Sequence, residues 1–181
     1  YSCALLASAK LMCWGDNWSG KLGNGTETDS PFPVEVSGIS TATSFDSGGG
    51  NTCAIVMNGK VLCWGYNGEG RLGDGTTNNA LTPVEVSSIT TAKGIAVGEH
   101  TCAVLINGTA MCWGANSNGR LGDGTTTNRL TPVMVLNITS VTSIALGRWH
   151  SCAVLTDGKV KCWGSNGNGQ LGDGTTVGHR T

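Results

Sequence analysis

The stretch CAIVMNGKVLCWG, residues 53–65, places two cysteines ten positions apart around an Asn-Gly pair. Closely related phrases begin at Cys3, Cys102 and Cys152, which gives a period of 49 to 50 residues. A Gly-x-Leu-Gly loop follows every phrase, and in the first three copies a Pro-Val-x-Val segment follows the loop. Self-similarity at a fixed period indicates stacked supersecondary units. The 181 residues hold about 3.6 such units.

Each cysteine phrase predicts a β-hairpin. In the second copy, strand-like residues 53–56 and 60–64 flank Met57-Asn58-Gly59, which suits a three-residue loop closed by a left-handed glycine. The first copy has Ala9 in place of that glycine, so its loop departs from the pattern. This register sets the two cysteines of a copy directly opposite each other, at a distance that a disulfide accepts. Repeat symmetry then predicts four bonds: Cys3–Cys13, Cys53–Cys63, Cys102–Cys112 and Cys152–Cys162.

Other uses of the eight cysteines are weaker. Reduced thiols buried in the core are the alternative to disulfides. Zinc is disfavoured because cysteines ten apart across a hairpin form no knuckle and no paired histidines complete a ligand set. Four disulfides imply an oxidising compartment, so we expect the protein to be extracellular or on a cell surface.

The fold class predicted is all-β, of the β-propeller type. Both faces of the hairpin at residues 53–63 are apolar, which is typical of a sheet covered on both sides. The Pro-Val-x-Val segment and an apolar stretch such as residues 94–98 add two further strands, which makes the four strands of one propeller blade. We therefore expect one repeat domain, residues 1–181, with units 1–50, 51–99, 100–149 and an incomplete 150–181.

The copies share the pattern [His/Asn]-[Thr/Ser]-Cys-Ala-Val-Leu, Gly-x-Val-x-Cys-Trp-Gly-x-Asn, Gly-x-Leu-Gly-Asp-Gly-Thr and Pro-Val-x-Val. This pattern resembles the repeat of the regulator of chromosome condensation family over essentially the whole chain. The resemblance implies a β-propeller, usually of seven four-stranded blades. Members include exchange factors for a small GTPase, a plant ultraviolet-B photoreceptor and a secreted bacterial β-lactamase inhibitor, so the fold alone implies no single activity.

Two departures from that family pattern shape the expectation. Cysteines replace residues that are commonly Leu and Ser in the repeat, which suggests a disulfide-bearing extracellular branch. Seven blades would need roughly twice this length, so we expect a fragment, a partial ring or an open assembly. An uncapped end exposes an unpaired strand and an apolar face, which favours association with other copies.

Composition excludes several classes of protein. The formal net charge of -1 argues against nucleic acid as a partner, because phosphate binding requires a basic face. No run of 18 apolar residues is present, so we expect no membrane insertion. No signal peptide is visible, and the start at Tyr1 suggests a mature, trimmed or partial chain.

Candidate sites outside the repeat are few. Asn17, Asn24, Asn107 and Asn137 head N-glycosylation sequons, with Asn107 expected at an exposed hairpin tip. Trp18 and Trp149 have no counterparts in other copies, so together with Arg148 they are candidates for contacting a sugar or a protein partner, although partial burial is the alternative. By contrast, the tryptophan after each second cysteine is expected to pack between blades.

No enzyme and no cofactor are expected, because no catalytic set stands apart from the repeat itself. The Asp of each Leu-Gly-Asp-Gly-Thr loop is interpreted as a turn residue, since one carboxylate per loop is too few for a calcium cage. We therefore expect a secreted or cell-surface structural or adhesive protein that contacts other proteins and self-assembles. The alternative is a binding module or inhibitor that recognises a protein or carbohydrate through its loops.

One position breaks the repeat pattern at a buried site. Met12, Leu62 and Met111 occupy equivalent places in the first three hairpins, and Lys161 occupies that place in the fourth. An unpaired buried ammonium is costly. We therefore expect Lys161 to be exposed and the fourth hairpin to meet a different neighbour, either solvent or another chain.

Overall fold

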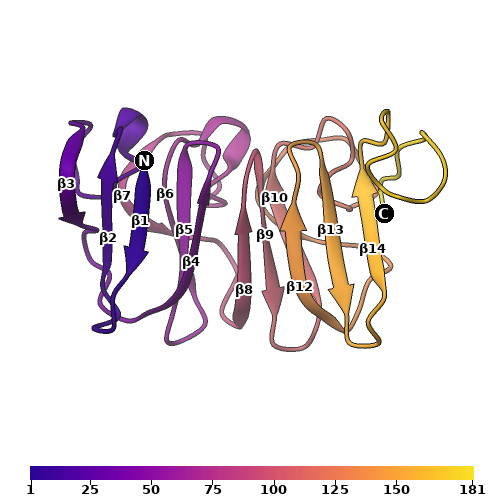
Figure 1. Ribbon diagram of the computed structural model, residues 1–181, viewed down its shortest axis with the longest axis horizontal. Coiled ribbons are helices and arrows are strands. Elements are labelled where there is room, and N and C mark those ends of the chain that lie inside the picture. The colour runs from indigo at the N-terminus through magenta and orange to yellow at the C-terminus, as the bar shows by residue number, and fades with distance from the viewer.

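The computed structural model describes all 181 residues as four antiparallel β-sheets that succeed one another along an arc (Figure 1). We refer to the sheets as the first to fourth blades. Their strands are β1 (Ser2–Leu5), β2 (Leu11–Gly15) and β3 (Ser30–Glu35); β4 (Ala42–Gly48), β5 (Asn51–Val56), β6 (Val61–Gly65) and β7 (Ala80–Glu85); β8 (Ala92–Val97), β9 (His100–Leu105), β10 (Ala110–Gly114) and β11 (Arg129–Met134); and β12 (Val141–Leu146), β13 (His150–Leu155) and β14 (Val160–Gly164). Two short 3-10 turns, η1 (Trp18–Gly20) and η2 (Gly68–Gly70), complete the regular elements, and neither has the length or apolar character to span a bilayer.

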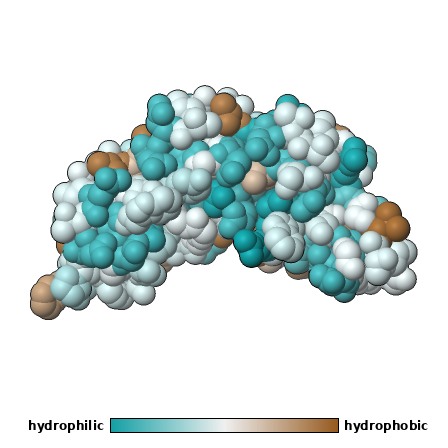
Figure 2. Space-filling model, turned by 90° about the horizontal axis from the view of Figure 1, so that it is seen from above, coloured by the Kyte–Doolittle hydropathy of each residue, from teal (hydrophilic) through white to brown (hydrophobic).

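The all-β propeller-type prediction is confirmed, but the blades are offset from the predicted units. The stretch 94–98 was expected to complete unit 51–99, yet β8 pairs with β9 of the following hairpin. The physical reason is the short connection after β7, which carries the chain onto the next sheet. Strands β4, β8 and β12 contact one another, so these first strands lie along the inner edge of the arc. Seen from above in Figure 2, the molecule is a crescent with a concave lower edge.

Each hairpin adopts the predicted register, with its two cysteines directly opposite. Gly59 closes the second loop with φ 76°, as the three-residue turn requires. Ala9 adopts nearly the same conformation in the first loop, with φ 62°, even though an L-residue is disfavoured there. The turn is therefore imposed by strand pairing as well as by glycine.

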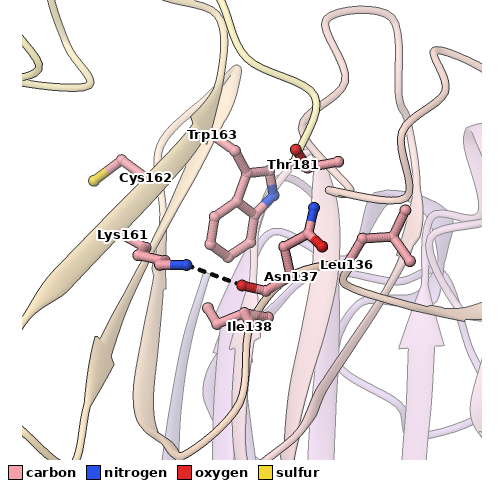
Figure 3. Close-up of a pocket in the computed structure, with 7 residues that line it drawn as sticks. All are labelled: Leu136, Asn137, Ile138, Lys161, Cys162, Trp163 and Thr181. Carbon is pink, nitrogen blue, oxygen red and sulfur yellow. Dashed lines mark hydrogen bonds between the residues drawn. The ribbon is translucent and has the colours of Figure 1, made fainter.

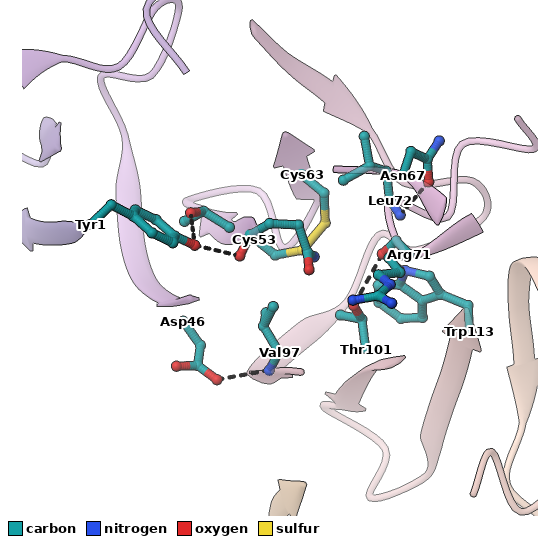
Figure 4. The surroundings of a disulfide bond; sticks show 12 residues. Tyr1, Asp46, Cys53, Cys63, Asn67, Arg71, Leu72, Val97, Thr101 and Trp113 are labelled. Atoms are coloured by element: carbon teal, nitrogen blue, oxygen red, sulfur yellow. Dashed lines mark hydrogen bonds between the residues drawn. A yellow bond between two sulfur atoms is a disulfide. The ribbon is translucent and has the colours of Figure 1, made fainter. Parts of the chain in front are cut away.

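All four predicted disulfides are present, and each joins Cα atoms 4.1 Å apart. The bonds lie on the blade face that meets the following blade. Cys53 and Cys63 are fully buried in a cluster with Leu72 and with Trp113 of the third blade (Figure 4). The disulfides therefore link the two strands of a hairpin and also pack in the interface between blades.

In the second, third and fourth blades, the tryptophan that follows the second cysteine joins its blade to the preceding one, which confirms the predicted packing role for these three residues. Its side chain is fully buried in the second and third blades, and its indole Nε1 donates to a backbone carbonyl of the preceding blade. These bonds join Trp64 to Lys21 at 3.0 Å, Trp113 to Arg71 at 2.9 Å and Trp163 to Arg120 at 2.9 Å. Hydroxyls of Thr101 and Ser151 donate to two of the same carbonyls, at 3.0 and 2.8 Å.

A pair of glycines tests how tightly this interface is packed. Gly73 has φ 72°, and a Cβ there would lie 2.7 Å from Nε1 of Trp113, whereas Gly172 has φ 69° and open space around it. Both alanine variants suffer the backbone strain of a left-handed residue, but only Gly73→Ala also pushes against the indole. We expect Gly73→Ala to lower the free energy of unfolding by at least about 1 kcal/mol more than Gly172→Ala, measured by urea denaturation. Equal losses would contradict the packing described.

Lys161 is exposed, as expected, but its neighbour is the ordinary one. Its Nζ donates to the backbone carbonyl of Asn137 in the third blade at 2.9 Å, beside a cavity of about 200 Å³ that Trp163 also lines (Figure 3). Ala153 and Trp163 pack against the third blade as their equivalents do in earlier copies. The expectation of a different neighbour is therefore wrong, because the lysine snorkels to the rim of an otherwise regular interface.

Candidate functional site

A polar site lies where the second, third and fourth blades meet, in the loops that follow β6 and β10 and in those that precede β9 and β13. A cavity of about 210 Å³ opens there, lined by Glu69, Arg71, Glu99, Ala115, Ser117, Arg120, Asn128, Arg148 and Trp149. Figure 2 views the molecule from above and shows hydrophilic residues over the middle of the crescent and on both of its arms. We call this site the arginine cavity.

Arg71 forms the neutralised wall of the arginine cavity. It is 6% exposed, and its NH2 group contacts Glu99 at 2.6 Å and Glu69 at 3.2 Å. Its NH1 group donates to the carbonyl of Gly49 at 3.2 Å, and its guanidinium lies 5.0 Å from the ring centroid of Tyr66. Two carboxylates and an aromatic ring therefore satisfy this buried charge.

Arg120 forms the opposite wall and has no carboxylate within salt-bridge distance. It is 4% exposed; NH1 donates to the carbonyl of Arg148 and NH2 donates to Oγ of Ser117, both at 2.8 Å. Its Nε is buried and has no hydrogen-bond partner. Burial lowers the pKa of Arg120, with the nearby Glu99 opposing that shift and Arg71 adding to it. The guanidinium remains a cation at neutral pH.

The structure brings together two of the three predicted contact residues. Arg148 and Trp149 both line the arginine cavity, where the Arg148 guanidinium lies 5.0 Å from the Trp149 ring centroid and Trp149 is 44% exposed. Trp18 is 60% exposed and lies outside the cavity, with its ring centroid 5.3 Å from that of Tyr66. Of the three predicted contact residues, Arg148 and Trp149 therefore belong to the candidate site and Trp18 does not.

A buried histidine lies beside this site, at the interface between the third and fourth blades. His100 is fully buried, and its Nε2 is 2.7 Å from Oγ of Ser151. Because Ser151 donates its only proton to the carbonyl of Arg120, Nε2 of His100 must carry a proton and donate to Ser151. The other ring nitrogen, Nδ1, is buried without a partner. Burial lowers the pKa of His100 to about 3, with Arg120, His150 and Arg71 acting in the same direction.

The predicted glycosylation sites fall in different environments. Asn17 is fully buried, and its Nδ2 donates to carbonyls of Thr26 and Thr28 at 2.9 and 3.0 Å, so this prediction is wrong. Asn24 is partly buried, whereas Asn107 and Asn137 are exposed. Asn107 lies at a hairpin tip, as expected, and modification of the three remaining sites stays a prediction.

The reason for the burial of Asn17 is a loop-closing role that our sequence analysis missed. Its equivalents Asn67, Asn116 and Asn166 are also buried. In the third copy, Nδ2 of Asn116 donates to Asp123 at 3.1 Å and to two loop carbonyls, while its Oδ1 accepts the N–H of Leu121 at 3.0 Å. One side chain thus fixes the whole Gly-x-Leu-Gly-Asp-Gly-Thr loop. The signal was present, since an Asn stands at this position in all four copies.

The loop aspartates are turn residues, as predicted. Asp123 accepts the N–H and the hydroxyl of Thr125 at 3.0 and 2.8 Å, and its other oxygen accepts from Arg129. Burial opposes ionisation of Asp123, but these hydrogen bonds and that from Asn116 outweigh it and hold the pKa of the carboxyl below its usual value. The carboxylate is therefore occupied within its own loop.

Four antiparallel sheets in an arc, joined by tryptophan-to-carbonyl hydrogen bonds, define an open β-propeller-type repeat protein. The sequence profile described as "Regulator of chromosome condensation (RCC1) repeat" matches residues 10–55, 58–105 and 107–154. A second profile with the same description matches residues 42–71 and 141–170. The chain belongs to the RCC1 repeat family.

Solved structures show the same fold. Yeast RCC1 (Prp20), crystallised with Kap60, has a TM-score of 0.83 and 19% identity, and the match covers 96% of this chain and 44% of that one. Human WBSCR16 has a TM-score of 0.83 and 21% identity, covering 98% and 48%. The ectodomain of the Physcomitrella patens receptor kinase CR4 has a TM-score of 0.53 and 24% identity, covering 91% and 39%. The chain thus spans less than half of each, and no curated protein sequence matches it.

Proposed function

We propose that this chain is a non-enzymatic structural or adhesive repeat protein of the extracellular space or cell surface, which acts through protein–protein contacts. Four disulfides within 181 residues support an oxidising compartment. Partners that are proteins suit the fold, since Prp20p of Saccharomyces cerevisiae has binding properties toward Gsp1p and histones. We further propose that the chain associates end to end with copies of itself.

The observation that carries self-association is the apolar character of both end faces. Trp14 of the first blade is only partly buried, whereas its equivalents Trp64 and Trp113 are fully buried against the preceding blade. On the opposite end, Val154 and Val160 are 38% and 61% exposed. In the third blade these two positions are occupied by buried residues of the cluster shared with the fourth blade. Each end face therefore has the composition of an internal interface.

The test is the oligomeric state of the oxidised 181-residue chain, measured by sedimentation across the micromolar range. We expect concentration-dependent association of the wild type and a shift toward monomer in Val160→Lys, because the equivalent Ala110 is fully buried between two blades and an interface would bury an unpaired ammonium there. Val160 is 61% exposed in the single chain, so the fold tolerates the change. Met57→Lys is the control, at a hairpin tip that is 75% exposed. A wild-type chain that stays monomeric would refute self-association.

The alternative, a module that binds a protein or carbohydrate through loops, is favoured by one specific observation. The arginine cavity combines buried cations with an exposed tryptophan, and Arg and Trp are enriched among residues that dominate binding energy at protein interfaces. This role is compatible with end-to-end association because the cavity lies over the middle blades and the apolar faces lie at the ends.

A further inference from the structure

Arg71 and Arg120 are equivalent residues of successive blades, each eight positions after the second cysteine of its hairpin. Both are buried, at 6% and 4% exposure, and both contact the loop that precedes the next blade's hairpin, Arg71 through Glu99 and Arg120 through the carbonyl of Arg148. Their backbone carbonyls also accept equivalent indole hydrogen bonds. The two side chains therefore occupy corresponding places at successive blade interfaces, although NH1 of Arg71 donates to Gly49 of its own blade.

The two arginines differ in their counter-charges. The carboxylates that neutralise Arg71 come from Glu69 and Glu99. In the next copy the equivalent positions hold Asn118 and Trp149, so the repeat supplies no carboxylate to Arg120. A buried charge without an opposite charge in contact with it is strongly destabilising. Arg120 thus lacks the acidic side chain that the preceding copy supplies to Arg71 at the positions equivalent to Asn118 and Trp149.

A second cation strengthens the same imbalance. Arg148 stands where the preceding copies have Gly49 and Gly98, and it adds a guanidinium to the lining of the arginine cavity. The cavity then holds three arginines against two glutamates, and both glutamates contact Arg71. Trp149 provides an exposed apolar surface at the rim. Charge and shape together fit an anionic group attached to an aliphatic stem.

We propose that the arginine cavity binds an acidic side chain, glutamate or aspartate, of a partner protein, with its carboxylate on Arg120 and Arg148 and its stem on Trp149. A protein carboxylate fits better than an acidic sugar because the repeat itself fills the equivalent place with glutamate side chains. The cavity, at about 210 Å³, also suits one side chain and is smaller than a typical small-molecule pocket of roughly 300–1,000 Å³. This inference does not depend on end-to-end association.

The test is titration of the oxidised chain with a hexaglutamate peptide, observed by NMR through the Nε–Hε signals of its arginines, with hexaglutamine as the uncharged control. We expect hexaglutamate to shift the Arg120 and Arg148 signals, with binding weakened by added salt. Trp149→Glu places a carboxylate at the position of Glu99, so we expect at least about tenfold weaker peptide binding together with a raised Tm. Trp18→Glu adds the same charge outside the cavity and should leave binding unchanged.

Each other outcome would overturn the proposal. Equal binding of hexaglutamate by Trp149→Glu and the wild type would place the peptide elsewhere on the surface. Absence of any shift at Arg120 and Arg148 in the wild type would show that the cavity does not accept a protein carboxylate. Oligogalacturonate that shifts these signals where hexaglutamate does not would assign the cavity to acidic carbohydrate instead. The Tm readout confirms that a variant without binding is still folded.

Discussion

Asn116→Asp is expected to lower the free energy of unfolding by about 3–5 kcal/mol, the usual cost of an uncompensated buried charge. The wild-type amide is fully buried, and its Nδ2 donates to Asp123 at 3.1 Å and to carbonyls of Thr125 and Thr127 at 3.2 and 3.0 Å. Aspartate replaces that donor with an oxygen, which then faces two carbonyls and a second carboxylate. Chemical denaturation of the oxidised protein at pH 7 measures the loss.

Asn107→Asp is the matched control for this variant. It makes the same change at the exposed hairpin tip of the same blade, where the fourth copy carries Asp157, so we expect a change within about 0.5 kcal/mol. If the two variants lost similar stability, the loop would owe its shape to its glycines and not to the buried amide. The same comparison applies to the other copies because Asn17, Asn67 and Asn166 are buried in equivalent loops.

The parts of the fold that were predictable from sequence are those that depend on local pairing. A three-residue turn fixes which residues of a hairpin face each other, so the opposition of Cys53 and Cys63, and with it the disulfide, follows from spacing alone. The offset of the blades was not predictable in this way. Strand β8 has equally apolar neighbours before and after it in the chain, and only three-dimensional packing decides that β9 is its partner.

The candidate site was predictable in outline only. Trp149 and Arg148 stood out because they break the repeat, and they do line the cavity. Arg120 did not stand out, because its neighbour Arg148 lies 28 residues away and across a blade interface. Asn17 was misassigned for the opposite reason: the sequon Asn17-Trp-Ser is local, whereas the loop that buries the amide closes 9 to 11 residues further on.

The histidine at the third interface makes a prediction about acid stability. A histidine in the unfolded chain has its usual pKa of 6.5, whereas burial lowers the pKa of His100 to about 3 in the folded protein. Between these values the unfolded chain binds a proton that the folded chain excludes. The stabilisation is therefore complete above pH 6.5 and is lost as the pH falls, by about 1.4 kcal/mol per pH unit until the folded pKa is reached.

His100→Asn tests this directly, because asparagine occupies the equivalent position 51 in the second blade. The free energy of unfolding is measured by denaturation between about pH 4.5 and 6.0, above the range where most carboxylates titrate. It should rise less steeply with pH in the variant than in the wild type, by an amount that corresponds to close to one proton. Protonating His100 would give Nδ1 a hydrogen with no acceptor, beside the charges of Arg120 and Arg71. Nε2 of His100 donates to Ser151, and Ser151 donates to the carbonyl of Arg120. Protonation of His100 therefore weakens the hydrogen bonds that join the third and fourth blades. An unchanged slope in the variant would show that His100 reaches solvent before the chain unfolds.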